Sequence, residues 1–312
     1  GPPPALRMVG RRRNPRSRKG QAMDPMTFIT GTKIPVGRTA KQAFDWLQAN
    51  SARLFDAISD GLEALIGAIL WAFQTPHPLL VVALFVALTW MLQRSWKTCL
   101  LVLLGFLFIL NQGYWRATTE SLTLVLSACV VCMGIGVPIG IAAAHRPRLY
   151  QAIAPVLDLM QTIPSFVYLI PAAMLFGLGK VPAILATVIY ATPPLIRLTD
   201  LGIREVDREV VEASRAFGAT RWQILKGVQV PLAMPSIMQG INQTMMMALA
   251  MVVIASMIGA RGVGETVLLG LQRGDSGQGL LGGLAIVLLA IVFDRITQAY
   301  GQRVQTHRAA GG

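Results

Sequence analysis

The chain has 312 residues, of which 54% are hydrophobic and 14% are charged, and its formal net charge is +13. A mean hydropathy of +0.55 excludes an ordinary soluble domain and favours a membrane protein with several spans. The first 22 positions contain a basic cluster, made up of Arg7, Arg11, Arg12, Arg13, Arg16, Arg18 and Lys19.

We interpret residues 1–38 as a disordered basic head that is partly non-native, because the segment is rich in Pro, Gly and Arg and has no apolar period. Met23 is a candidate natural start. A basic arm that binds anionic lipid or nucleic acid is the alternative function for this head, although we expect no nucleic-acid partner.

Residues 39–76 place apolar side chains at helical spacing among acidic ones, as in Phe44, Leu47, Leu54 and Phe55. This pattern predicts an amphipathic helix at the membrane interface. The apolar end of the segment leaves an eighth membrane span open as an alternative.

Seven apolar segments predict transmembrane helices, because a span needs roughly 20 mostly apolar residues. The first two, in 77–113, are short and are interpreted as accessory helices. The region 114–302 forms the predicted core, and 303–312 a cytoplasmic tail. The seven predicted spans are 78–93, 98–111, 119–144, 153–176, 181–196, 235–258 and 280–293, with 300 as an alternative end of the last.

The distribution of Lys and Arg predicts the orientation of these spans. With seven spans and an internal C-terminus, most basic loop residues fall on the inner side, as the positive-inside rule requires. The loop 197–234 contributes most to this bias, through Arg197, Arg204, Arg208, Arg215, Arg221 and Lys226. We therefore expect this loop to be cytoplasmic and the N-terminal arm to lie outside.

The loop 197–234 is polar, and its pattern predicts two short helices that are interrupted at 217–220. Gly218 suits the position after a helix end, where a positive φ is needed, and Thr220 suits the N-cap of the next helix. Such a loop could dock onto another protein or fold back on its own bundle, and the residues alone leave both interpretations open.

Within this loop, a spaced set of residues resembles the signature loop of ABC importer permeases. The signature places EAA, Gly and a later apolar-x-apolar-Pro at fixed spacing, and Ser214 departs from it mildly. In that family the loop inserts into a groove on a separate ATPase subunit. The matching positions are Glu212, Ala213, Ser214, Gly218, Val228, Val230 and Pro231.

The segments 158–179, 190–203 and 232–259 extend the resemblance to permease subunits of glycine betaine and proline betaine importers, with choline and carnitine importers as close relatives. The resemblance covers about 114–302. It implies an all-α type I ABC importer permease of the bacterial inner membrane, paired with a second copy, two ATP-binding subunits and an extracytoplasmic substrate-binding protein. ATP and Mg would be bound by the ATPase, with no cofactor or metal on this chain.

Polar and aromatic residues near the predicted proline breaks are candidates for the translocation pathway. Hydrogen bonding between helices is the alternative role for the polar ones, and packing the alternative for the aromatic ones, which otherwise could hold a quaternary ammonium by cation–π attraction. Met246 lies in a methionine-rich run that suits either a gate or plain filling. The candidates are Gln161, Thr162, Pro164, Phe166, Tyr168, Tyr190, Asn242, Gln243 and Met246.

An enzyme is not favoured, because the sequence has no P-loop motif and no His, Cys and carboxylate set with metal spacing. Cys129 and Cys132 share a helix face, and we interpret them as packing residues rather than a metal pair. We therefore expect a permease for a quaternary-amine osmolyte, coupled to an ATPase through 205–231. The alternatives are a permease for another small solute, such as an amino acid, and an ion-coupled carrier.

Overall fold

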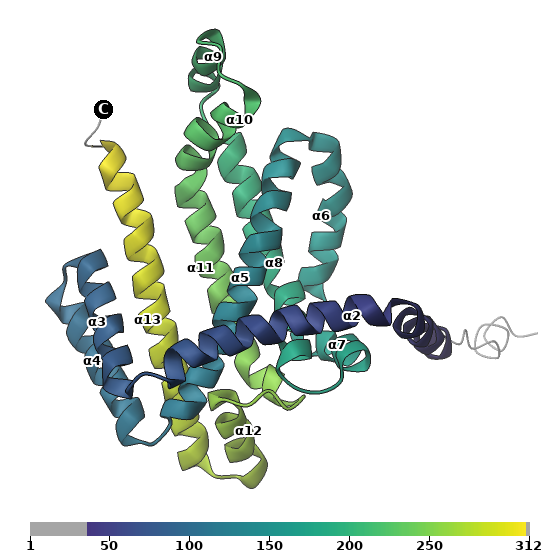
Figure 1. Cartoon of the computed structure of the whole chain (residues 1–312), viewed down its shortest axis with the longest axis vertical. Coiled ribbons are helices and arrows are strands. Elements are labelled where there is room, and N and C mark those ends of the chain that lie inside the picture. Colours follow the sequence, from purple (N-terminus) through teal and green to yellow (C-terminus); the bar gives the residue numbers. More distant parts are fainter. Residues whose placement is uncertain (1–35, 310–312) are drawn as a thin grey trace, which may run out of the picture. The chain divides into compact units, whose positions relative to one another are not determined.

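The computed structural model describes the backbone of residues 36–309 and the side chains of 37–298, and the predicted basic head at 1–35 lies outside this part. Within these residues the regular structure is helical (Figure 1). Its elements are α2 (Val36–Gln74), α3 (Pro78–Gln93), α4 (Trp96–Asn111), α5 (Trp115–His145), α6 (Pro147–Thr162), η1 (Ser165–Tyr168), α7 (Leu169–Phe176), α8 (Lys180–Arg204), α9 (Arg208–Ala216), α10 (Arg221–Ile224), η2 (Leu225–Gln229), α11 (Val230–Ser256), α12 (Val263–Arg273) and α13 (Ser276–Ala309).

The chain divides into two compact units at 47/48, and the division falls within α2. Just beyond it, Ser51 leaves helical geometry (φ −120°, ψ 17°), so α2 consists of two helical stretches joined by a kink. In the second stretch Leu62 and Ile66 are buried in the main core, whereas Trp71 is exposed. The helix predicted over 39–76 is therefore present, and the part of it that belongs to the second unit buries an apolar face in that unit's core.

The centre of the second unit is formed by α5, α8 and α11, which contact one another along much of their length. Glycines allow these close approaches. A Cβ at Gly140 would lie 2.6 Å from the Thr199 Cβ, and one at Gly202 would lie 2.7 Å from the Ser236 Cβ. Gly136 and Gly140 both face α8, so glycines line this helix contact.

Four helical segments in the described residues are long and apolar enough to cross a membrane: α5, α8, 221–256 and 276–298. The pairs α2–α3 and α6–α7 each qualify together but bend by 98° and 106°. Counting each bent pair as one span gives up to six spans, rather than the seven that the sequence predicted. The difference arises because α4 is too short to qualify alone.

One proline break that the sequence predicted is present, and one predicted span boundary is wrong. The segment 153–176 is not one helix, because Ile163 and Pro164 adopt extended ψ values of 129° and 134° between α6 and η1. A residue that precedes proline avoids the helical region, which explains this break. Conversely, α8 does not end at Pro193 and Pro194 but continues to Arg204, since helices inside a bundle tolerate proline when neighbouring groups satisfy the freed carbonyls.

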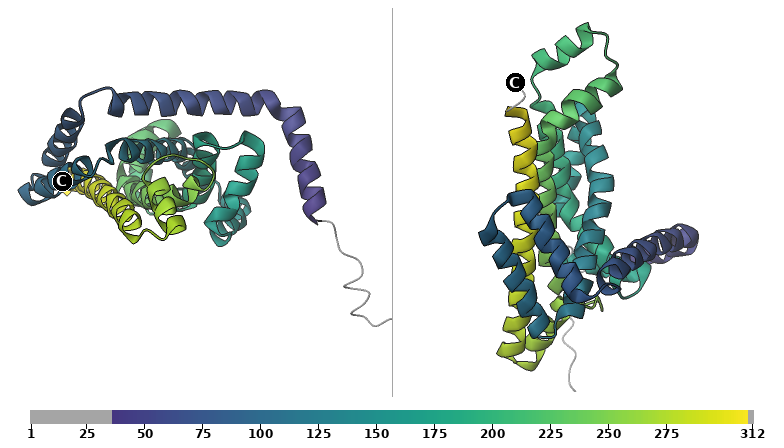
Figure 2. Two further views of the ribbon diagram at one scale, coloured as in Figure 1. Left: turned by 90° about the horizontal axis from the view of Figure 1, so that it is seen from below. Right: turned by 60° about the vertical axis from the view of Figure 1, so that its left-hand side comes forward.

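The two ends of the central bundle carry different structures (Figures 1 and 2). At one end α9 and α10 project beyond α8 and α11, and the C-terminal end of α13 lies at this same end. At the opposite end lies α12, which begins at Val263 and ends at Gly274, a glycine in the left-handed conformation.

Candidate functional site

The segment 205–231, which we call the lever, is ordered by local caps and a glycine turn. Asp207 accepts a hydrogen bond from the Glu209 amide (3.0 Å) and starts α9. After α9, Gly218 has φ +81°, and its amide donates to the Arg215 carbonyl (2.9 Å). This left-handed turn is the geometry that the sequence predicted for Gly218.

A capping box begins the next helix, and Thr220 is its N-cap residue, as the sequence predicted. The Gln223 side-chain oxygen accepts from the Thr220 amide (2.8 Å), and the Thr220 hydroxyl accepts from the Gln223 amide (3.4 Å). The second helix is not short, however. It passes through the π-helical turn at 225–229 directly into α11, where Pro231 occupies the first turn and needs no backbone donor.

Apolar side chains are exposed at the tip of the lever. Phe217 is 93% exposed and Trp222 is 68% exposed, while Glu212 and Ala213 of α9 are also exposed. Val228, Val230 and Pro231 are half-buried near the bundle. A single chain therefore leaves an apolar tip in solvent, which is characteristic of a surface that a partner covers.

Two polar contacts attach the base of the lever to the end of α5, and neither was predicted from the sequence. The Arg204 guanidinium pairs with the buried Asp200 carboxylate (2.9 Å), donates to the Ala143 carbonyl (3.3 Å) and lies 4.8 Å from the centre of the Tyr150 ring. It joins the last turn of α8 to α5 and α6. The hydrophobic periodicity of the sequence shows Asp200 only as a charged residue in an apolar helix and does not show which groups it contacts.

The second contact joins the π-helical turn to the same end of α5. The His145 ring lies 2.8 Å from the Ile141 carbonyl oxygen and 3.0 Å from the Gln229 side-chain oxygen. Beside it, a pocket of about 620 Å³ separates α5 from the lever. Movement of the lever would therefore pull on α5 at both ends of the lever, near Arg204 and near Gln229. The pocket is lined by Pro138, Ile141, Ala142, His145, Arg146, Trp222, Leu225, Lys226 and Val230.

Eight of the nine predicted pathway residues fall into three groups, and Asn242 stands apart. Gln161, Thr162, Pro164 and Phe166 are exposed at the break between α6 and η1. Gln243 and Met246 are exposed on α11. Tyr168 and Tyr190 pack against each other, with ring centres 6.5 Å apart.

Asn242, in contrast, connects α11 to α13. Its amide nitrogen lies 3.2 Å from an Asp294 carboxylate oxygen, and its carbonyl oxygen accepts from the Thr297 hydroxyl (2.7 Å). Tyr168 is also engaged, since its hydroxyl donates to the Met160 carbonyl (2.7 Å). These contacts match the helix-joining role that the sequence left open for the polar candidates.

The opposite end of the bundle is held by contacts between loops. The Gly179 amide donates to the Ile258 carbonyl (2.9 Å), and the Val263 amide donates to the Ser121 hydroxyl (2.8 Å). Lys180 lies 3.7 Å from the Glu120 carboxylate. These contacts join α5, α8 and the α11–α12 connection on the side away from the lever.

The described side chains contain no group of three or more His, Cys, Asp and Glu residues that could hold a metal ion. Cys129 and Cys132 are buried in the core, and the Thr192 hydroxyl lies 3.3 Å from the Cys132 sulfur. This is the packing environment expected of small polarizable side chains.

Comparison with known proteins agrees with this geometry. The protein family described as "Binding-protein-dependent transport system inner membrane component" matches residues 136–306. The glycine betaine/carnitine transport permease protein GbuB of Listeria monocytogenes is 45% identical over 255 residues, covering 81% of this chain and 90% of GbuB.

Two further relatives have similar identities. The glycine betaine transport system permease protein OpuAB of Bacillus subtilis is 42% identical over 266 residues, covering 85% of this chain and 94% of that protein. The glycine betaine/proline betaine permease ProW of Escherichia coli is 44% identical over 276 residues, covering 87% of this chain and 76% of ProW.

The fold is similar to that of a solved ABC importer. A chain from the inward-facing MetNI methionine ABC transporter superposes with a TM-score of 0.52 at 26% identity, covering 61% of this chain and 94% of that chain. Together with the capped lever at one end of an apolar helix bundle, these similarities identify the chain as a multi-pass inner-membrane permease subunit of the binding-protein-dependent ABC importer family.

Proposed function

We propose that this permease carries a quaternary-amine osmolyte, of which glycine betaine is the first candidate, into the cell by ATP-driven alternating access. The observation that carries the proposal is the 42–45% identity to three glycine betaine permeases over most of the chain. Proline betaine, carnitine and choline occur in the names of relatives and belong to the same chemical class. All share a cationic ammonium centre whose charge is shielded by carbon.

The lever is the proposed contact with the ATPase. Its support is the apolar tip formed by Phe217 and Trp222, presented on a rigid glycine turn and attached to the bundle through Arg204 and His145. Closure of two ATPase subunits with ATP and Mg would move two levers together. The movement would reach α5 through the contacts at the lever's base and change which side of the pathway is open.

A second copy of the chain is the proposed partner within the membrane. The support is a set of large apolar side chains that remain exposed near the pathway candidates, including Phe166 (56%), Ile170 (60%) and Met246 (44%). A pathway lined by two copies would cover them. An extracytoplasmic binding protein would deliver the substrate at the α12 end, with the lever and the C-terminus in the cytoplasm, in agreement with the Lys and Arg distribution.

A permease for an amino acid is the second candidate, and the similarity to the methionine importer favours it. That similarity is weaker, at 26% identity, than the similarity to betaine permeases. An ion-coupled carrier is not favoured, since the similarities are to ABC permeases and the buried Asp200 is already paired with Arg204.

Uptake by the reconstituted importer tests the proposal. Proteoliposomes containing this chain with its ATPase, and the binding protein outside, should accumulate labelled glycine betaine only when ATP is enclosed. Labelled choline, carnitine and methionine would be compared at equal concentration. Preferential methionine uptake would favour the second candidate, and uptake driven by an ion gradient without ATP would refute the importer mechanism.

A further inference from the structure

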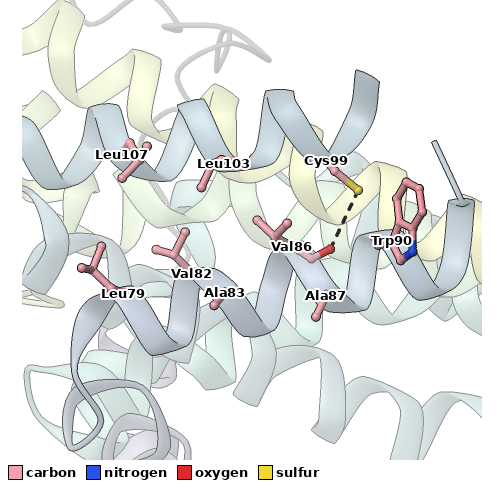
Figure 3. A pocket seen from close by; sticks show the side chains of 9 residues that line it. All are labelled: Leu79, Val82, Ala83, Val86, Ala87, Trp90, Cys99, Leu103 and Leu107. Carbon is pink, nitrogen blue, oxygen red and sulfur yellow. Dashed lines mark hydrogen bonds between the residues drawn. The ribbon is translucent and has the colours of Figure 1, made fainter. Parts of the chain in front are cut away.

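An apolar groove of about 470 Å³ runs between α3 and α4 (Figure 3). Small side chains form part of its floor, since Ala83 and Ala87 line it between larger neighbours. The Cys99 thiol donates a hydrogen bond to the Val86 carbonyl oxygen (3.9 Å). The groove therefore offers little beyond apolar contact along its length. Its lining residues are Leu79, Val82, Ala83, Val86, Ala87, Trp90, Cys99, Leu103 and Leu107.

The dimensions of the groove suit one hydrocarbon chain. At 1.5 Å per helical residue, the distance along α3 from Leu79 to Trp90 is about 17 Å, close to the ~15 Å of one bilayer leaflet. Dividing the volume by that length gives a mean cross-section of about 28 Å², so the groove is a narrow one along the two helices. An acyl chain fits along it.

One end of the groove carries positive charge and tryptophan. Trp90 is the last residue of α3 that lines the groove. In the turn that follows, Arg94 adopts the left-handed conformation, and Trp96 and Lys97 come next in the chain. Arg94 and Lys97 are exposed, and neither belongs to the ion pairs found among the described residues. Tryptophan beside Lys and Arg is the usual composition of a helix end at the lipid headgroups.

This end of the groove lies on the lever's side of the membrane. The Gln93 side chain donates to the Arg295 carbonyl (2.5 Å), in the half of α13 that runs toward the lever, and the neighbouring Asp294 contacts Asn242 near the middle of α11. Asp294 also accepts from Gln298 (2.6 Å), so hydrogen-bond donors already engage the nearest carboxylate on α13. With the lever in the cytoplasm, the two basic residues face the inner leaflet, which is rich in anionic lipid.

We propose that the α3–α4 groove is a binding site for one anionic phospholipid of the inner leaflet. An acyl chain lies along Ala83 and Ala87, and the phosphate is held by Arg94 and Lys97. The assignment to the inner leaflet rests on the orientation given under Proposed function, but the site itself does not. Lipid binding by the complex is measured without uptake, so failure of this site and failure of the transport proposal are distinguishable.

Native mass spectrometry of the complete importer complex tests the site, with phosphatidylglycerol or phosphatidylcholine added as the probe. The parent complex should retain phosphatidylglycerol in a fixed number per permease copy and retain phosphatidylcholine poorly. The Arg94→Gln/Lys97→Gln variant should lower the retained phosphatidylglycerol at least tenfold. These two side chains are exposed, so the change leaves the helix packing intact.

Matched variants separate the site from general effects. Arg146→Gln/Arg148→Gln removes the same charge near the lever's side of the bundle, away from the groove, and should retain the lipid. Ala83→Phe fills the groove and should lose it, whereas Leu84→Phe, at a neighbouring position that is 65% exposed, should retain it. Equal retention of phosphatidylglycerol in all variants, or cross-linking of the Ala87→Cys variant to another protein chain, would overturn the proposal.

Discussion

His145 and Gln229 are 84 positions apart in the chain, yet their side chains lie 3.0 Å apart, and this contact connects the end of α5 to the π-helical turn of the lever. The same end of α5 is held by Arg204 through the Ala143 carbonyl. The residues at the start and at the end of the lever therefore contact one and the same helix, α5. A π-helical turn at such a point is consistent with the functional use of these irregularities in other proteins.

Loss of the His145–Gln229 contact should weaken the link between ATP hydrolysis and transport. Gln229→Leu removes a hydrogen bond worth about 1 kcal/mol, which corresponds to about fivefold in a coupled equilibrium. We expect uptake per ATP hydrolysed to fall by about that factor in proteoliposomes. Gln239→Leu, at an exposed position of α11, is the control and should leave the ratio unchanged. A normal ratio in Gln229→Leu would contradict the linkage.

Substitutions at the lever's turn should impair coupling while leaving membrane insertion unchanged. Gly218 has φ +81°, so Gly218→Ala costs about 1–2 kcal/mol in the left-handed region, and Gly218→Pro forbids the turn. Gly227→Ala is the matched control, because its φ is ordinary and a Cβ there meets nothing within 4 Å. ATPase co-purification and ATP-driven uptake provide the measurement.

Glu212→Lys tests the other half of the lever, where an exposed carboxylate of α9 is replaced by a cation. If this face binds the ATPase, the altered charge should reduce co-purification of the ATPase and lower uptake at least severalfold. Glu205→Lys, an exposed substitution just before α9, serves as a comparison of equal charge. Full transport by the Glu212→Lys permease would show that this carboxylate is not part of the docking surface.

The α5–α8 contact should depend on the absence of a side chain at Gly140. A Cβ there would meet the Thr199 Cβ at 2.6 Å and the Ile196 carbonyl oxygen at 2.8 Å, so the helices must separate. We expect Gly140→Ala to destabilise the fold by about 1–3 kcal/mol and to lower the denaturation temperature of the purified complex. Gly134→Ala, on the same helix with nothing within 4 Å, should have no such effect.

The Asp200–Arg204 pair should stabilise the base of the lever. Arg204→Met leaves the buried Asp200 carboxylate without its ion-pair partner, and a hydrogen bond to a charged group contributes about 1.5–3 kcal/mol. The denaturation temperature should therefore fall. Asp200→Asn combined with Arg204→Met removes the unpaired charge and should recover part of the loss. No difference between the single and double variants would mean that Asp200 is not left charged.

Several parts of this molecule follow from local sequence. The apolar segments predict helices that enter a membrane, because each backbone polar group must be satisfied within its own helix there. The lever is equally local, since the positive φ of Gly218 and the capping box of Thr220 need only neighbouring residues. The spacing from Glu212 to Pro231 then indicated the family. These features were predicted correctly because their interactions lie within a few residues of one another.

Only the tertiary structure placed residues that act across helices. Whether α8 continues through Pro193 and Pro194 depends on neighbours that satisfy the freed carbonyls, and such neighbours are distant in sequence. The attachment of the lever by Arg204 and His145 has the same origin, because both residues bond to groups more than sixty positions away. A chain specifies its helices and turns locally, but the partners of its buried polar groups are chosen by packing.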